Sequence, residues 1–259
     1  MKRQRLRSAS VALRDASLLQ RIGALKADHP AWGYRRIWSY LRYREGLRIG
    51  KNRVYRLLRE HRLLATQTRL LRARRGPLRD KPRTTLPNRV WGIDMTKIYV
   101  HSWGWLYLHL VLDWGSKKVA GWHLSTTSKT ADWLTPLSDA INVQFPNGRD
   151  GAPQLLLVSD NGCQPTSTSF MAACRALDLR QVFTTFNNPK GNADTERIFR
   201  TLKEDLIWPR DWFSFQQLHA ALARWFHDYN HDFPHSSLRH LTPAQYETIH
   251  HHLNPAPSP

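Results

Sequence analysis

The sequence predicts an α/β protein, in which a mixed sheet flanked by helices follows a small all-α helix-turn-helix domain. Three observations lead to this prediction: short amphipathic helical patterns in the first quarter of the chain, strand patterns that begin near residue 89, and a difference in charge between these two parts. With 259 residues, of which 41% are hydrophobic, the chain can fill the core of one sizeable domain and of a smaller one.

Basic residues are concentrated near the N-terminus. Residues 1–89 contain 25 Lys and Arg against 5 Asp and Glu, whereas residues 90–259 contain 14 against 15. Because each neutralised phosphate releases condensed counterions, a concentrated basic segment favours a polyanionic partner, and nucleic acid is the natural candidate. A solvated basic face is the alternative, but it gives no reason for the asymmetry.

Three short helical patterns fit residues 15–64. Each is marked by apolar residues at helical spacing: Leu18, Ile22 and Leu25, then Tyr34, Ile37 and Leu41, then Val54, Leu57 and Leu58. A short glycine-containing turn separates the second from the third, which fits a helix-turn-helix. The third helix begins with residues suited to base edges and phosphates, namely Lys51, Asn52, Arg53 and Arg56. On spacing alone, a generic basic three-helix bundle fits equally well.

Residues 66–88 are predicted to form a basic, proline-containing linker. They include seven Lys or Arg, one acidic residue and three prolines, with little apolar periodicity. The prolines favour extended conformations, and the positive charges suit a DNA backbone. We therefore assign residues 1–65 to a DNA-binding domain and place the next domain after the linker.

From residue 89 onward the pattern changes to strands. Segments rich in β-branched and aromatic residues, separated by turn signals, predict a meander of strands at 90–100, 105–112 and 119–124. The remaining pattern alternates helix and strand, at 131–143, 155–159, 169–177 and 181–185. The strand at 155–159 is apolar throughout, which is typical of a strand buried on both faces. This βββαβαβ order predicts a mixed sheet covered by helices.

Three acidic residues occupy related places in this pattern. Asp94 lies within the first strand, Asp160 follows the buried strand, and Glu196 begins a helix after the loop 186–192. In an α/β sheet the carboxyl end of a central strand faces the functional crevice, so the two aspartates converge if their strands are neighbours. The spacing of 35 residues between Asp160 and Glu196 is weak evidence by itself, because 20 residues of the chain are acidic. The strand, loop and helix around these residues are more specific.

The chemistry of this triad calls for two Mg²⁺ or Mn²⁺ ions. Carboxylates alone would repel one another and a phosphodiester, whereas divalent ions reverse the charge and prefer oxygen ligands. One ion can activate water or a 3′-hydroxyl while the other stabilises the leaving oxygen. Arg200 and Lys203 share a helix face with Glu196, and with Lys190 in the preceding loop they are predicted to contact DNA.

Each acidic residue also has a purely structural interpretation. Asp94 can be a strand-end charge, Asp160 an Asx-turn residue, and Glu196 a complement to a helix N-terminus. Two further acids compete for the site, but Asp113 fits a hairpin turn and Asp194 fits an N-terminal helix charge on another side of the helix. We favour the triad because the separate interpretations leave the common placement unexplained.

Other metal sites and a membrane location have less support. Cys163 and Cys174 are too few for a disulfide framework or a four-cysteine zinc site. His227 and His231 stand four residues apart, but they lack the glutamate of a zincin motif. The chain has neither a run of eighteen apolar residues nor a signal-peptide pattern, which indicates a cytosolic protein without a membrane partner.

Several motifs resemble OrfB-type transposases of the insertion-sequence-three family, within the retroviral-integrase-like DDE superfamily. The resemblance covers nearly the whole chain and rests on residues 29–37, 54–57, 91–96, 159–162, 191–196, 229–230, 234–236 and 241–243. It implies an RNase H-like fold, with residues 89–208 as the integrase catalytic core and residues 209–259 as a C-terminal helical extension.

The resemblance also implies an activity and its residues. Asp94, Asp160 and Glu196 match the acidic triad of the family, and Lys203 matches its trailing basic residue. The implied reaction is Mg²⁺-dependent cleavage at element ends followed by strand transfer by the freed 3′-hydroxyl. One departure lies directly after the glutamate, where the family often has Ser and Phe and this chain has Arg197 and Ile198. That departure affects local DNA contacts more than metal binding.

The implied partners are double-stranded DNA, as element ends and as target, and further copies of the chain that form a homo-oligomer on DNA. An upstream OrfA-type partner, joined by frameshifting, is implied as well, together with a bacterial, cytoplasmic and nucleoid-associated location. Two other functions stay open: a catalytically silent DNA-binding regulator derived from a transposase, and a basic structural RNA-binding protein. The intact triad argues against the first, and the second predicts no metal-dependent nicking.

Overall fold

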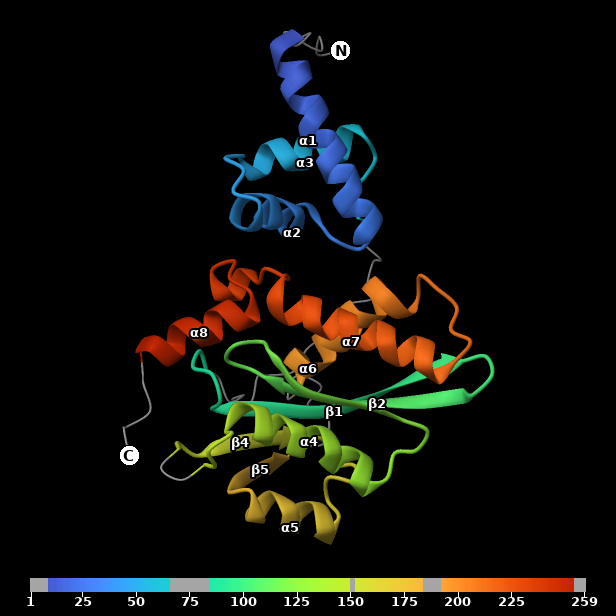
Figure 1. The fold of residues 1–259 in the computed structure, drawn as a ribbon, viewed down its shortest axis with the longest axis vertical. Helices are drawn as coiled ribbons and strands as arrows, with labels where there is room; N and C mark the ends of the chain where they lie inside the picture. The colour runs from blue at the N-terminus through green and yellow to red at the C-terminus, as the bar shows by residue number, and fades with distance from the viewer. Residues whose placement is uncertain (1–8, 66–83, 150–151, 184–191, 254–259) are drawn as a thin grey trace, which may run out of the picture. The chain divides into compact units, whose positions relative to one another are not determined.

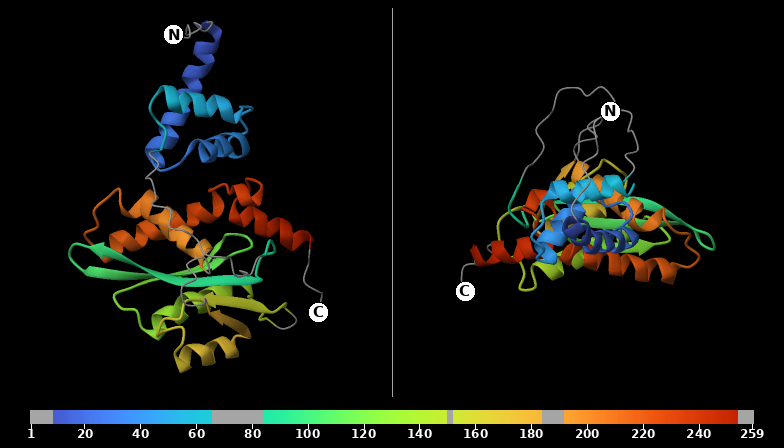
Figure 2. Two further views of the ribbon diagram at one scale, coloured as in Figure 1. Left: turned by 180° about the vertical axis from the view of Figure 1, so that it is seen from behind. Right: turned by 90° about the horizontal axis from the view of Figure 1, so that it is seen from above.

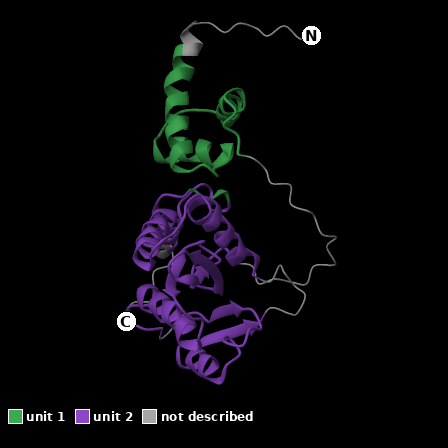
Figure 3. Cartoon of the chain, turned by 90° about the vertical axis from the view of Figure 1, so that its right-hand side faces the viewer, with its two compact units in different colours: residues 1–75, 234–236 green, residues 76–233, 237–259 purple. Residues whose placement is uncertain are grey.

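The structure is a computed structural model that describes residues 9–65, 84–149, 152–183 and 192–253. The chain forms two compact units, shown in Figure 3. The N-terminal unit comprises Met1–Arg75 with Pro234–Ser236, and the C-terminal unit comprises Gly76–Phe233 with Ser237–Pro259. The predicted linker lies outside the described residues except for residues 84–88.

The N-terminal unit is helical (Figure 1). Helix α1 (Ala9–Asp28) is followed by α2 (Tyr34–Ser39), which continues as a π-helical turn, η1 (Tyr40–Arg44), and then by α3 (Lys51–Glu60). The predicted apolar stripes form its core, and these side chains are buried: Leu18, Ile22, Leu25, Ile37, Leu41, Val54, Leu57 and Leu58. The turn between η1 and α3 contains Gly46 at a φ of 69°, a conformation that favours glycine.

The C-terminal unit is built on a five-stranded mixed sheet. Its strands are β1 (Val90–Val100), β2 (Gly104–Asp113), β3 (Val119–Ser125), β4 (Leu155–Ser159) and β5 (Leu179–Phe183), in the order β3-β2-β1-β4-β5. The first three strands pair antiparallel, and β4 lies parallel to both β1 and β5. The prediction of a mixed α/β sheet is confirmed.

Helices cover both faces of this sheet, as Figures 1 and 2 show. One face carries α4 (Thr130–Gln144) and α5 (Thr168–Ala176), and the other carries α6 (Ala193–Leu202) with its π-helical continuation η2 (Lys203–Ile207), α7 (Phe215–His231) and α8 (Pro243–Leu253). A short helix, η3 (Ser236–Leu238), comes between α7 and α8 in the chain. Trp91 and Ile93 of β1 point into the core under α4 and α5. Because side chains alternate along a strand, Gly92 and Asp94 face α6.

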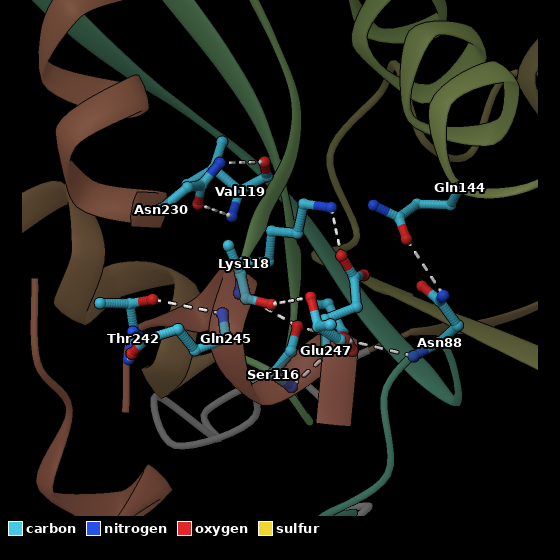
Figure 4. Close-up of polar contacts among 12 residues, drawn as sticks. Asn88, Ser116, Lys118, Val119, Gln144, Asn230, Thr242, Gln245 and Glu247 are labelled. Atoms are coloured by element: carbon cyan, nitrogen blue, oxygen red, sulfur yellow. Dashed lines mark hydrogen bonds and ion pairs between the residues drawn. The ribbon is translucent and has the colours of Figure 1, made fainter. Parts of the chain in front are cut away.

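The C-terminal helices close the outer edge of the sheet, next to β3 (Figure 4). The side chain of Asn230 donates a hydrogen bond to Val119 O at 3.0 Å and accepts one from Val119 N at 2.9 Å. Lys118 and Glu247 form an ion pair beside this contact. Since an edge strand exposes unpaired backbone groups, these contacts satisfy part of the β3 edge and attach α7 and α8 to it.

Across the described part of the chain, we find no helix with the length and apolar character needed to cross a membrane.

Candidate active site

Asp94 and Asp160 lie on neighbouring parallel strands. The register pairs Val90 with Leu156 and Gly92 with Val158. Two residues further along each strand, this register leads to Asp94 on β1 and to Asp160 directly after β4. The condition for the two aspartates to converge, that their strands are neighbours, is therefore met.

The carboxylate of Asp94 is in an unusual electrostatic environment. Burial raises the pKa of Asp94 to about 7, a hydrogen bond from the N–H of Met95 at 2.8 Å opposes this shift, and the charges of Asp160 and Glu196 add to it. Glu196 is therefore near enough, like Asp160, for its charge to act on Asp94. Burial is the largest cause of this shift, and the neighbouring carboxylates enlarge it.

Asp160 begins a loop that is fixed to the rest of the core. Its Oδ1 accepts a hydrogen bond from Gly162 N at 3.0 Å, which is the Asx turn expected for this sequence. Further along, Gln164 Nε2 donates to Ser128 O at 2.7 Å, and Thr166 Oγ1 donates to Gly162 O at 2.8 Å. The Asp160 side chain is exposed, so the turn leaves it accessible to a ligand.

Glu196 lies in the first turn of α6 and is exposed. The two competing acids make other contacts. Asp113 accepts hydrogen bonds within the β2–β3 turn, and Asp194 lies 3.5 Å from Lys117 Nζ and 3.8 Å from Arg197 Nη1. In the ranges that the structure describes, no three His, Cys, Asp or Glu side chains are already grouped as a metal site. The donor chemistry nevertheless fits Mg²⁺ or Mn²⁺, because Asp94, Asp160 and Glu196 offer only oxygen ligands.

The basic residues predicted to contact DNA differ in their surroundings. Arg200 is exposed on α6, and Lys203 is half-buried at the start of η2. Lys190 lies outside the described residues. On α3, Lys51 and Asn52 are exposed. Two members of the set have protein partners, since Arg53 and Arg56 both form ion pairs with Asp15 of α1 at 2.8 Å.

Comparison with known proteins places this arrangement in a family. A family model described as "Integrase core domain" matches residues 84–189, a second model with the same description matches residues 177–243, and one described as "HTH-like domain" matches residues 12–69. A protein of Mycobacterium tuberculosis strain H37Rv, named as a transposase for insertion sequence element IS986/IS6110, is 28% identical over 235 residues, which cover 85% of this chain and 82% of the relative.

A second relative carries a similar name. Transposase InsD for insertion element IS2D of Escherichia coli strain K12 is 26% identical over 241 residues, which cover 90% of this chain and 78% of the relative. The chain contains an integrase core domain and an HTH-like domain, and these relatives are named as insertion-sequence transposases. These matches confirm the resemblance to insertion-sequence transposases. They also confirm the prediction of a helix-turn-helix domain.

The fold of this integrase-core protein agrees with that assignment. A chain of the simian T-cell lymphotropic virus intasome, solved by cryo-electron microscopy in complex with PP2A regulatory subunit B56 gamma, superimposes with a TM-score of 0.55 and 20% sequence identity. The match covers 85% of this chain and 77% of that chain. The mixed sheet flanked by helices is thus the RNase H-like fold of integrases.

Sequence reasoning missed a contact among three residues of the integrase core, two of which are close in sequence to Asp94 and Glu196. Gly92 on β1 faces Thr195 on α6, and Trp114 Nε1 donates a hydrogen bond to Thr195 Oγ1 at 3.3 Å. The sequence contained one signal for this contact, because a glycine inside a strand often marks close approach of another segment. Nothing in the sequence pairs Trp114 with Thr195, which lie 81 residues apart.

Proposed function

We propose that this protein is a DDE-type transposase, a polynucleotidyl transferase that cuts DNA at the ends of its element and joins the freed 3′-hydroxyl to target DNA. The observation that carries the proposal is that the parallel pairing of β1 with β4 brings Asp94 and Asp160 to the same end of neighbouring strands in an integrase core. Similarity to named transposases and an HTH-like domain support the choice of DNA as substrate.

Asp94, Asp160 and Glu196 are the proposed metal ligands. Two Mg²⁺ or Mn²⁺ ions, when bound, would supply Lewis-acid charge for activating the attacking hydroxyl and for stabilising the leaving oxygen. The environment of Asp94 supports this assignment, because a carboxylate whose pKa is raised to about 7 by burial and by neighbouring carboxylates gains most from a nearby cation. Glu196 is exposed, so its side chain can turn toward Asp94 as ligands are bound.

The basic residues around the carboxylates have a separate role. We assign Arg200 and Lys203, which follow Glu196 along α6 and η2, to the phosphates that flank the scissile bond, with Lys190 as a third contact. Such contacts hold the backbone in register and carry no sequence information themselves. Recognition of the element ends is assigned to residues 1–65, with Lys51 and Asn52 exposed at the start of α3.

The remaining assignments follow from the same proposal. Residues 66–88 link the DNA-binding domain to the catalytic core at 89–208, and residues 209–259 brace that core. We further propose that the protein acts as a homo-oligomer on double-stranded DNA, in the bacterial cytoplasm at the nucleoid, with an OrfA-type protein as upstream partner. Two copies of the chain would supply one active site for each of the two element ends, which favours an oligomer.

The test is metal-dependent DNA cleavage and joining by the full chain. Labelled DNA carrying the sequences that flank the coding region is incubated with the protein and Mg²⁺ or Mn²⁺, and products are resolved on a denaturing gel. The wild type is expected to give nicked and joined products, and Asp160→Asn is expected to give none. Asp139→Asn, which changes an exposed acid on α4, is the matched control and should retain activity.

Two outcomes would overturn the proposal. Equal products from the wild type and Asp160→Asn would remove the triad from the chemistry. If the wild type binds the flanking DNA but yields no metal-dependent product, the protein is a DNA-binding regulator that retains the fold. Binding of RNA in preference to these DNA ends would instead support a structural RNA-binding protein.

A further inference from the structure

Gly92 lies on β1, two residues before Asp94, at the place where the first turn of α6 comes closest to the strand. A Cβ atom at this position would lie 2.3 Å from Thr195 Oγ1, 2.5 Å from Trp114 Nε1 and 3.0 Å from Asn192 Oδ1. Such contacts are shorter than van der Waals packing allows. Only glycine lets α6 and the indole ring approach β1 this closely.

This contact joins residues that are close in sequence to two of the proposed ligands. Gly92 and Asp94 share one face of β1, because side chains alternate along a strand. Thr195 directly precedes Glu196 in the first turn of α6. The close approach at Gly92 and Thr195 therefore sets how far the backbone of Glu196 lies from the backbone of Asp94.

A buried hydrogen bond fixes the same contact from a third segment. Thr195 is completely buried, Trp114 is 2% exposed, and Trp114 Nε1 donates to Thr195 Oγ1 at 3.3 Å. Trp114 itself is attached to the sheet, since its backbone N–H donates to Val90 O at 2.9 Å. Lys117 adds a second link, because its Nζ donates to Trp114 O at 2.6 Å and lies 3.5 Å from Asp194.

The turn that carries Trp114 is held by the buried carboxylate of Asp113. Its oxygens accept hydrogen bonds from Gly115 N at 3.1 Å, from Ser116 N at 3.2 Å and from Ser116 Oγ at 2.6 Å. A turn with so many internal hydrogen bonds is a firm support for the indole ring. The first turn of α6 is thus fixed by the strand on one side and by this turn on the other.

We propose that Gly92, Thr195 and Trp114 are positioning residues that set the separation of Glu196 from Asp94, and through it the affinity of the carboxylate site for divalent metal. The inference rests on the proposed function and adds to it the residues that hold the third ligand in place. Residues that orient metal ligands from behind change metal affinity by about 10- to 100-fold when they are replaced.

The test uses substitutions at Thr195 that preserve the fold. Thr195→Val keeps the volume and removes the acceptor of the indole N–H, whereas Thr195→Ser keeps the hydroxyl. The matched control is Thr201→Val on the same helix, because the Thr201 hydroxyl donates only to Arg197 O of its own helix at 3.1 Å. Binding of Mn²⁺ to the DNA-free full chain is measured by electron paramagnetic resonance, and kcat and KM are measured with end DNA.

Thr195→Val is expected to weaken Mn²⁺ binding about 10-fold and to lower kcat while KM for DNA stays near the wild-type value. Thr195→Ser should restore most of the affinity, and Thr201→Val should behave as the wild type. Gly92→Ala should weaken Mn²⁺ binding further, because its Cβ clashes with both Thr195 Oγ1 and Trp114 Nε1. If Gly92→Ala does not fold, Trp114→Phe is measured in its place, because it removes the donor of the hydrogen bond to Thr195 Oγ1.

Failure of the positioning role and failure of the proposed function would give different Mn²⁺-binding results. The positioning role would be overturned if Thr195→Val and Trp114→Phe bind Mn²⁺ as tightly as the wild type while Asp94→Asn loses binding. That result would leave the proposed function standing. Mn²⁺ binding that is unaffected by Asp94→Asn would overturn the proposed function itself. A loss of thermal stability in Thr195→Val with unchanged Mn²⁺ affinity and kcat would assign the contact to folding alone, against the inference.

Discussion

Arg56 on α3 donates a hydrogen bond to the buried carboxylate of Asp15 on α1 at 2.8 Å. Arg53 donates to the other oxygen of that carboxylate, also at 2.8 Å. Burial by itself would raise the pKa of Asp15, but the hydrogen bonds and charges of Arg56 and Arg53 outweigh it and lower the pKa. The two arginines therefore hold α3 against α1, in addition to the DNA contact that we predict for them.

Replacement of Asp15 by Asn is expected to loosen the helix-turn-helix. The substitution removes the two ion pairs that Asp15 makes with Arg53 and Arg56, which we expect to cost about 1–3 kcal/mol. Hydrogen exchange of the α3 amides in the full chain measures this loss locally. Glu60→Gln is the matched control, because Glu60 also pairs with Arg56, at 3.1 Å, but on the surface, where such pairs contribute less than about 1 kcal/mol. Equal exchange in both variants would contradict the role of Asp15.

Lys51 is expected to act on DNA as a phosphate contact. It is exposed at the first position of α3, where the helix N-terminus also attracts anions. Lys51→Ala should weaken binding to all DNA sequences alike and lower the dependence of log K on log salt by about one. Fluorescence anisotropy across a salt series measures this slope. Arg21→Ala is the control, because Arg21 is already paired with Glu45, and a slope equally lowered in both variants would refute a specific role for Lys51.

The fold could be predicted from the sequence where local patterns decide it. The strands 90–100 and 155–159 have the predicted bounds, because each is a run of apolar and β-branched residues between clear turn signals. The fifth strand was expected at 181–185 but begins at Leu179. Asp178 adopts a φ of 51°, which ends the preceding helix abruptly and lets Leu179 pair with Leu155 at once. That conformation is set by the tertiary pairing and has no signal in the sequence.

The candidate site was only partly predictable for a similar reason. The sequence made the convergence of Asp94 and Asp160 conditional on the adjacency of their strands, and the β1–β4 register meets that condition. In contrast, the partners Arg56 and Asp15 are 41 residues apart, and Trp114 and Thr195 are 81 residues apart. Such pairs depend on how whole elements pack, so a single sequence does not reveal which arginine holds a helix and which one faces DNA.

Asn230 offers a test of the C-terminal brace. Its amide makes both a donor and an acceptor bond to the backbone of Val119, at the edge of the sheet (Figure 4). Asn230→Ala is expected to lower the free energy of unfolding of the C-terminal unit by about 1–3 kcal/mol, because two backbone groups lose their partner. Urea unfolding followed by circular dichroism measures the change. Gln216→Ala, at an exposed amide on the same helix, should have little effect, and an equal loss in both would exclude the brace.

The imidazole of His109 is completely buried between the sheet and α4. Its Nε2 lies 3.1 Å from Ser128 Oγ, and its Nδ1 has no hydrogen-bond partner among the described residues. Burial lowers the pKa of His109 to about 4; the charge of Asp132 and the backbone of His123 oppose this shift, and the charge of the His123 ring adds to it. His109 is therefore neutral in the folded protein at any pH well above 4.

A pH-dependent stability follows from this histidine. A histidine in the unfolded chain binds a proton below about pH 6.5, whereas His109 in the folded protein binds one only near pH 4. The stability that depends on neutral His109 is therefore fully present above about pH 6.5 and is lost as the pH falls through about 4. Between pH 7 and pH 4.5, we expect the free energy of unfolding of His109→Gln to fall by about 2–3 kcal/mol less than that of the wild type. Urea unfolding measures this difference. His227→Gln, at an exposed position on α7, should lose as much as the wild type. If His109→Gln and the wild type lose the same stability over this interval, the buried imidazole is protonated in the folded state, and the acid sensitivity of the core must come from its carboxylates.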